Sequence, residues 1–420
     1  MLAGMPLLAH ALAALLALAA PLPAAELPAT GAEAAATPAQ APEAQAESAA
    51  GGDNDDDADE PAGAEDAEAE ASQGNEPKGA AGLSFTGDLS DQELQRRWRS
   101  DLASLGSISV GFADQGRMIN AAQLKDGAGW VCQRPDLAFG TQETVDGLAA
   151  AFRAVHDQFP GSAPARLSHI GAREGGFLKP HRSHQAGRDA DIGFFYKDDA
   201  LPGRRSRPEK LIDPARNWAL LRALITNADV QMILVDRSIQ KVLRDYAIAE
   251  GEDRGWVDSL FHGRVTSSEE GAAPASGAIV PALIKHARRH RDHFHVRFYS
   301  PRSQELGRRI QPLLAERSEQ NLTIHRVKRG QTLGHIAQLY ATTVPALMKA
   351  NRMRKSFLRL DQRLLVPLRK PCTRCPLPPA LVSVPPRRLP PGFEPVPEPF
   401  VPITTTLVLR APELSSQLSK

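Results

Sequence analysis

The chain has 420 residues, twelve histidines, three cysteines and a formal net charge of +1 at pH 7. Three cysteines cannot supply the four thiolates of a structural zinc site, so a metal centre would need other ligands. The charge is unevenly spread, because residues 26–82 hold fifteen acidic side chains and one lysine, which leaves +15 on the rest. A basic body of this kind suits an anionic wall or envelope surface.

The first 25 residues are uncharged and rich in Ala, Leu and Pro. The apolar run at 11–20, followed by Pro-Leu-Pro-Ala-Ala, is typical of a signal peptide and its cleavage site. We therefore expect residues 1–25 to be a signal peptide and the protein to be exported to the periplasm or cell envelope, without stable membrane insertion after cleavage. The alternative is an uncleaved anchor, although the apolar stretch is short for a membrane span.

Residues 26–83 are predicted to be a disordered acidic linker. They consist mainly of Ala, Glu, Asp, Gly and Pro, with no aromatic residue before position 83. Such a segment cannot bury enough apolar surface to offset the entropy lost on ordering. A specific function for the linker and a simple effect on solubility both remain open.

Residues 84–303 are predicted to form an α+β domain, with a small antiparallel sheet and flanking helices. Apolar residues recur with helical spacing over 141–159, and Asp213-Pro214 is a typical helix start. Residues 230–235 form a short apolar run typical of a strand, and another helical pattern covers 239–246. The Gly-, Pro- and charge-rich stretches at 197–212 and 262–280 are expected to be loops.

Two further strands, at 191–196 and 294–299, are expected at the centre of this domain. Polar and apolar residues alternate from His293 to Tyr299. Successive side chains of a strand point to opposite faces, so His293, His295 and Arg297 would share one face. Phe294 and the other apolar residues of this stretch would then face the core.

Five of the twelve histidines fall within two short windows, residues 181–191 and 290–295. A catalytic zinc ion takes three nitrogen or oxygen ligands and leaves a fourth position open for water. His184, Asp191 and His295 would supply that set. The clustering favours a hydrolytic metal site over unrelated surface or core histidines.

These two motifs resemble those of the penicillin-insensitive murein endopeptidases, within the lysostaphin and D-Ala-D-Ala metallopeptidase superfamily. That superfamily has a His, six residues, an Asp and later His-x-His, which correspond here to His184, Asp191 and His293-Phe-His295. The resemblance extends over about residues 107–303. It implies zinc binding by His184, Asp191 and His295, and it implies a general base or transition-state stabiliser in His293, with His181 and His290 beside the site.

The resemblance further implies one catalytic zinc ion, with His181 as a less certain ligand. Some family members hold a second metal with an Asp-x-x-His segment between the motifs, but His262 and His286 are the only histidines of 197–289 and neither follows such an Asp. Asp189 is a second candidate carboxylate in the first motif, but only Asp191 has the spacing that the resemblance requires. We expect Asp189 to be solvated or to support a ligand.

Two features just before the first motif are ambiguous. Arg173 could bind a substrate carboxylate or be simply solvated. The pair Gly175-Gly176 could let the backbone approach a ligand or could permit a tight turn.

Residues 323–368 form a second predicted unit, with a strand, two short helices and a closing strand. This βααβ pattern resembles a lysin-motif (LysM) domain, which binds the N-acetylglucosamine-containing glycan of peptidoglycan. The matching residues are Gly330, Thr332, Leu333, Ile336, Ala337, Leu347, Asn351 and Leu364. The alternative, a helix-turn-helix module, would need a cytoplasmic chain and nucleic acid as partner, which the predicted export argues against.

The predicted organisation is completed by a linker at 304–322 and a Pro-rich tail at 369–420, expected to be extended or disordered. In an exported chain, Cys372 and Cys375 could form a disulfide, which would leave Cys132 free and buried.

Three functions are compatible with this organisation. The first is a zinc D,D-endopeptidase that hydrolyses D-Ala to diaminopimelate cross-links of peptidoglycan, as the resemblance implies. The second is a wall-binding protein without turnover. The third is a zinc D-Ala-D-Ala carboxypeptidase, although that branch usually has Glu before its last His motif, where this chain has His290.

Overall fold

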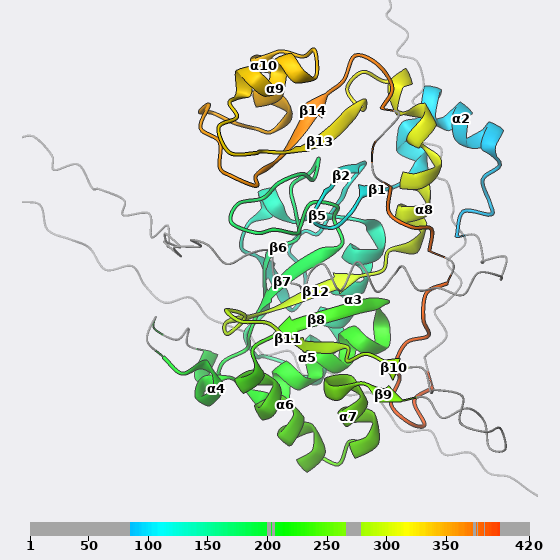
Figure 1. Ribbon diagram of the computed structural model, residues 1–420. Helices are drawn as coiled ribbons and strands as arrows, with labels where there is room; N and C mark the ends of the chain where they lie inside the picture. Colours follow the sequence, from blue (N-terminus) through cyan, green and yellow to red (C-terminus); the bar gives the residue numbers. More distant parts are fainter. Residues whose placement is uncertain are drawn as a thin grey trace, which may run out of the picture. The chain divides into compact units, whose positions relative to one another are not determined.

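The computed structural model describes residues 85–394, except 200–202, 204–205, 266–278, 373–374, 376 and 382 (Figure 1). The predicted signal peptide, the predicted acidic linker and the end of the tail lie outside these residues, and the expectations for them remain predictions. Within the described residues, no helix combines the length and the apolar character that crossing a membrane requires.

A six-stranded mixed sheet forms the centre of the first domain, with the strand order β11-β8-β12-β7-β6-β4. The three central pairings, β8–β12, β12–β7 and β7–β6, are antiparallel, and the two edge pairings are parallel. The predicted antiparallel strands are therefore found at the centre of the sheet. Its strands are β4 (Trp130–Cys132), β6 (Ala165–His169), β7 (Asp189–Gly193), β8 (Val230–Val235), β11 (Ile284–His286) and β12 (His293–Phe298).

Two of the helices that flank this sheet begin where the sequence predicts. Thr141 caps α3 (Gln142–Gln158) by accepting a hydrogen bond from the backbone N–H of Thr144. Asp213 caps α5 (Pro214–Asn227) in the same way, with proline in the first turn, where its missing N–H costs no hydrogen bond. Further helices follow, namely α6 (Arg237–Ala249), which the sequence predicts, and α4 (Pro208–Leu211) and α7 (Arg254–His262), which it does not. The short helix α4 lies in the stretch 197–212 that was expected to be a loop.

The two faces of the sheet differ in character. Apolar side chains of the central strands, such as Ile192, Phe294 and Val296, join those of α3 and α5 in one hydrophobic core. Because side chains alternate along a strand, the intervening residues of β7 and β12 lie on the opposite face. The predicted alternation of β12 is therefore found, and the polar face is left free to build a site.

A second, smaller core lies between the N-terminal segment and the end of the domain. It is built from α2 (Asp91–Ser100), β1 (Ile108–Gly111), β2 (Gly116–Ile119) and α8 (Pro301–Arg309). Short elements complete the domain, namely β3 (Ala122–Gln123), β5 (Phe139–Gly140), β9 (Arg264–Val265), β10 (Ile279–Val280), and the 3-10 turns at Leu102–Leu105, Pro135–Leu137, Lys197–Asp199 and Gln311–Glu316.

The second unit has the predicted βααβ order, with β13 (Leu322–Arg326), α9 (Leu333–Leu339), α10 (Val344–Ala350) and β14 (Arg363–Pro367). Thr332 and Thr343 cap the two helices. The strands pair antiparallel and enclose a small core with both helices. This unit therefore has a core of its own.

The described part of the Pro-rich tail contains no helix or strand, and it contacts the first domain. The indole Nε1 of Trp256 donates to the carbonyl oxygen of Arg388 at 2.7 Å, and Arg387 forms an ion pair with Asp229 at 2.8 Å. The predicted disulfide between Cys372 and Cys375 is present, and Cys132 is free and buried.

Candidate metal centre

Strand register places three candidate ligands in one row on the polar face of the sheet. Asp191 in β7 is the cross-strand partner of His295 in β12 on one side, and of His169 in β6 on the other. The register of β6 against β7 shifts between Leu167 and His169, which marks a bulge at this point. Directly opposed residues of an antiparallel pair have neighbouring side chains, so these three side chains meet.

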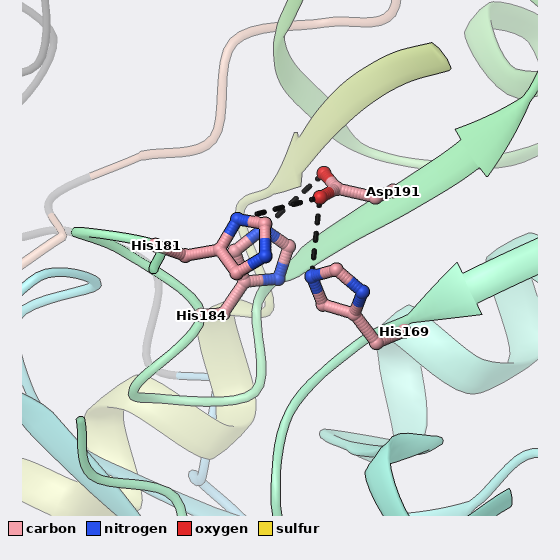
Figure 2. Close-up of side chains that lie close together, drawn as sticks. All are labelled: His169, His181, His184 and Asp191. Atoms are coloured by element: carbon pink, nitrogen blue, oxygen red, sulfur yellow. Dashed lines mark ion pairs between the residues drawn. The ribbon is translucent and has the colours of Figure 1, made fainter. Parts of the chain in front are cut away.

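The loop between β6 and β7 carries two further histidines, His181 and His184, whose rings lie close to Asp191 and His169 (Figure 2). His184 is completely buried, and its backbone has a left-handed φ of 65°. This conformation is costly for a residue with a Cβ, and such strain is concentrated at functional sites. The loop can pack this closely because Gly187 has a φ of +71°, and a Cβ there would collide with Met118 and Gly140.

The three ligands predicted from the sequence form a nearly regular triangle. His184 Nε2 lies 3.2 Å from Asp191 Oδ1 and 3.2 Å from His295 Nδ1, and His295 Nδ1 lies 2.9 Å from Asp191 Oδ1. Tetrahedral zinc with bonds of about 2.0–2.1 Å has ligand atoms roughly 3.3 Å apart. These three atoms therefore fit one face of a zinc coordination tetrahedron.

Hydrogen bonds orient both imidazoles for metal binding. His184 Nδ1 lies 2.8 Å from the carbonyl oxygen of Ile170, which can only accept, so Nδ1 carries the proton and Nε2 is a free lone pair. His295 Nε2 lies 3.1 Å from Asp189 Oδ1, so in the neutral ring the proton sits on Nε2 and the lone pair on Nδ1. Partners of this kind fix the tautomer and raise the basicity of a ligand histidine.

Asp189 is the partner on which this arrangement depends. The prediction left open whether Asp189 is solvated, and that alternative is wrong, since its side chain is fully buried. Its Oδ1 accepts from Arg297 Nε at 2.6 Å, and its Oδ2 accepts from the backbone N–H of His184 at 3.2 Å. One carboxylate thus holds a candidate ligand from each motif, and Arg297 compensates its buried charge.

His293 lies beside the triangle rather than within it. Its Nδ1 donates to Asp292 Oδ1 at 2.7 Å, so its Nε2 faces the site, 3.8 Å from Asp191 Oδ2. The ring of His290 lies 5.0 Å from that of His293, and its Nδ1 donates to the carbonyl oxygen of Arg288 at 3.1 Å. The structure therefore places both predicted neighbours next to the ligand set.

Two histidines flank the other oxygen of Asp191. His169 Nε2 lies 3.1 Å from Oδ2, and His181 Nδ1 lies 3.7 Å from it. Donor atoms of His169, His181, His184 and Asp191 all lie within 4.8 Å of one another, so this cluster could hold a metal ion. His169 was not predicted from the sequence, because its position beside Asp191 depends on the pairing of β6 with β7.

The protonation states of the site depend on burial and on neighbouring charged groups. Burial opposes ionisation of Asp191, but the neighbouring His184 and His293 hold its pKa well below the ordinary value. Burial lowers the pKa of His181 to about 3 and that of His290 to about 4. At neutral pH these two rings are uncharged, as a metal ligand must be.

The pKa of His295 shifts in the opposite direction to those of His181 and His290. Burial lowers its pKa, but hydrogen bonds to Asp189 and Asp191 outweigh this and raise the pKa to about 10 without metal. A metal ion must then displace the proton from Nδ1. Metal binding should therefore release a proton and weaken as the pH falls.

The structure shows what surrounds Arg173 and the Gly175-Gly176 pair, the two features just before the first motif. The exposed Arg173 lies over the ring of Phe139, with 4.5 Å from its guanidinium carbon to the ring centroid. Gly175 and Gly176 both have positive φ, and the N–H of Gly176 donates to the carbonyl oxygen of Gln185 at 2.9 Å. The glycine pair thus permits a turn that contacts the segment next to His184.

Comparison with known proteins assigns both parts of the chain. Residues 109–320, half of the chain, match the sequence profile of the penicillin-insensitive murein endopeptidases. Residues 325–367 match the profile of the LysM domain. A search among curated proteins found no match.

The surroundings of Asp189 lead to a prediction. Asp189→Asn keeps the shape of the side chain but loses the charge that fixes the His295 tautomer, so zinc affinity should fall by about 10–100-fold. The measurement is competition with a chromophoric chelator, and circular dichroism would check folding. Asp136→Asn, in an exposed ion pair with Arg134, is the matched control. Unchanged zinc affinity in a folded Asp189→Asn protein would show that His295 is oriented by something else.

Proposed function

Because the chain belongs to the penicillin-insensitive murein endopeptidase family, we propose that it is a zinc-dependent D,D-endopeptidase that hydrolyses D-Ala to diaminopimelate cross-links in peptidoglycan. The family establishes a peptidase that acts on murein. The observation that supports zinc dependence is the triangle of His184 Nε2, Asp191 Oδ1 and His295 Nδ1, whose edges of 2.9–3.2 Å match zinc coordination.

The three proposed ligands and the neighbouring His293 would have separate roles in hydrolysis. Zinc held there would supply Lewis acidity, which activates water and polarises a carbonyl group. His293 presents Nε2 to the same space, while Asp292 holds its Nδ1 proton at 2.7 Å. It is therefore placed to take a proton from water and return it to the leaving amine, or to stabilise the developing oxyanion.

His290 would assist His293, because its ring lies 5.0 Å from that of His293 and 5.8 Å from that of His295. Its low pKa keeps it neutral at pH 7, so it adds no positive charge beside the metal. Arg173 is not assigned a part in the hydrolysis step, since its guanidinium lies over the ring of Phe139. We retain it only as a candidate for binding a substrate carboxylate.

The LysM domain indicates that peptidoglycan is the partner of the second unit. We propose that it brings the peptidase to the wall in the periplasm or cell envelope. A glycan-bound module raises the local concentration of cross-links at a tethered active site. The two activities would then depend on different parts of the chain, which allows them to be tested separately.

The ligand assignment predicts how four variants differ. His184→Ala, Asp191→Ala and His295→Ala should each lose zinc and hydrolysis, because a site with three protein ligands tolerates no loss. His293→Ala should keep zinc but lose roughly 10²–10⁴ in turnover, the usual contribution of a positioned acid or base. Elemental analysis and cleavage of a soluble cross-linked muropeptide provide the two readouts.

His262→Ala is the matched control, since this histidine is exposed on α7, outside the cluster. Stoichiometric zinc in a folded His184→Ala, Asp191→Ala or His295→Ala protein would refute that ligand. Loss of metal in His293→Ala, as complete as in His295→Ala, would mean that the roles of the two histidines are reversed.

The domain organisation makes a further prediction. Deleting residues 320–420 should slow the attack on intact sacculi by up to about 10²–10⁴ while leaving cleavage of a small soluble muropeptide nearly unchanged. The deletion also removes the tail contacts at Trp256 and Asp229. The control is therefore the double variant Arg387→Ala, Arg388→Ala, which loosens the tail but keeps the module.

Equal losses on both substrates would mean that the deleted part supports folding of the peptidase. Undiminished attack on sacculi would mean that the module does not target the enzyme to the wall. Losses in the double variant as large as those in the deletion would assign the effect to the tail.

A further inference from the structure

The backbone next to His184 is held from two sides. The N–H of Gln185 donates to the carbonyl oxygen of Ala113 at 3.0 Å, and the carbonyl oxygen of Gln185 accepts from the N–H of Gly176 at 2.9 Å. Ala113 lies between β1 and β2, and Gly176 follows the turn at 173–174. The position of His184, whose Nε2 belongs to the proposed zinc triangle, therefore depends on these two segments.

Two arginines of the LysM domain contact the same two segments. Arg352, which follows α10, donates from Nη1 to Glu174 Oε2 at 2.9 Å and from Nη2 to the carbonyl oxygen of Gly175 at 3.0 Å. Arg363 in β14 donates from Nη1 to the carbonyl oxygen of Asp114 at 2.5 Å, and the same nitrogen lies 2.6 Å from Asp114 Oδ2. Each arginine thus contacts a residue next to one of the two backbone partners described above.

Close packing and a fixed linker hold the LysM domain against these segments. A Cβ on Gly176 would come within 2.9 Å of Leu365 Cδ1 in β14, so the two domains approach closely there. Arg117 of β2 is buried, and it donates to the side-chain oxygen of Gln320 at 2.7 Å and to its carbonyl oxygen at 2.5 Å. Arg117 also pairs with Gly175 through a backbone bridge. One strand therefore holds both the entry to the LysM domain and the glycine turn.

We propose that the LysM domain braces the loop that carries His184, and that Arg352 and Arg363 are positioning residues for zinc binding. The proposal rests on the proposed function only in that His184 is a zinc ligand. A loop that must become ordered on binding loses affinity, whereas a loop already held in place does not. The brace therefore acts on the metal-free protein and raises its zinc affinity. Bound zinc holds His184 by itself, so turnover at saturating zinc should not depend on the brace.

The exposure and the charges of these contacts set the size and the sign of the effect. The ion pair of Arg352 with Glu174 contributes little by itself, because the two side chains are 43% and 61% exposed. Arg363 and Asp114 are less exposed, at 23% and 31%, so their contact contributes more. Coupling between two sites is typically about 5–150-fold, and these contacts place the brace near the lower end. Simple electrostatics acts in the opposite direction, because removing a cation near the site would favour zinc binding.

The test measures the zinc affinity of the metal-free full chain by competition with a chromophoric chelator. The double variant Arg352→Ala, Arg363→Ala should bind zinc about 5–15-fold more weakly than the wild type, with Arg363→Ala alone causing most of the loss. Arg326→Ala is the matched control, because Arg326 forms an exposed ion pair with Asp361 inside the LysM domain. Circular dichroism checks the folding of each variant.

Hydrogen exchange of the metal-free proteins tests the route of the effect. The N–H groups of Gln185 and Gly176 donate the two hydrogen bonds that hold the loop, so both should exchange faster in the double variant. Amides of α3, which packs against the apolar face of the sheet, should not change. If the arginine variants do not fold, Glu174→Gln removes one contact from the peptidase side, and the same two amides are its readout.

Unchanged or higher zinc affinity in the folded double variant would overturn the proposal, as would unchanged exchange of both amides. Muropeptide cleavage that stays slow at saturating zinc would also contradict it, because bound zinc should hold His184 without the brace. Deletion of residues 320–420 should weaken zinc binding in the same way, so its muropeptide assay is made at saturating zinc.

Failure of the proposed function gives a different result. It would appear as a wild type that binds zinc but cleaves no cross-linked muropeptide. That result leaves the difference in zinc affinity between the wild type and the double variant unchanged.

Discussion

The register of three antiparallel strands is the constraint on which the site depends. Asp191 lies in β7 between His169 in β6 and His295 in β12, so both neighbours are directed at its carboxylate by backbone hydrogen bonds. A shift of one residue in either pairing would turn the ligands into the apolar core. The core residues of β7 and β12, among them Ile192 and Phe294, resist that shift because it would expose them. Packing on one face of the sheet thereby fixes the chemistry on the other.

Buried charge is the cost of this arrangement, and a network of partners offsets it. Asp189 is fully buried, yet it accepts from Arg297, from His295 and from the backbone of His184. Removing one member of such a network leaves the others buried without compensation. The network also fixes which nitrogen of His295 is free, so stability and metal-binding geometry depend on the same contacts.

Much of this could be predicted from the sequence, because local signals govern it. The structure confirms the element types and faces that were predicted from the helical spacing over 141–159, the helix start at Asp213 and the alternation along β12. The spacing of His184 and Asp191 identified ligand candidates that do lie together. His169 could not be found in this way, since it depends on the register and bulge between β6 and β7. The burial of Asp189 was equally hidden, because Arg297 lies 108 residues away along the chain.

We propose that this sheet-built cluster makes the protein a metal-dependent enzyme that opens peptidoglycan cross-links. Digestion of purified sacculi with and without a chelator, followed by mass analysis of the fragments, tests it most directly. The account predicts that cross-linked dimers disappear and that each yields two monomers whose summed mass exceeds the dimer by one water. A chelator should stop this, and added zinc should restore it. Cleavage that persists after the protein is shown to be metal-free, or release of free D-Ala alone, would contradict the claim.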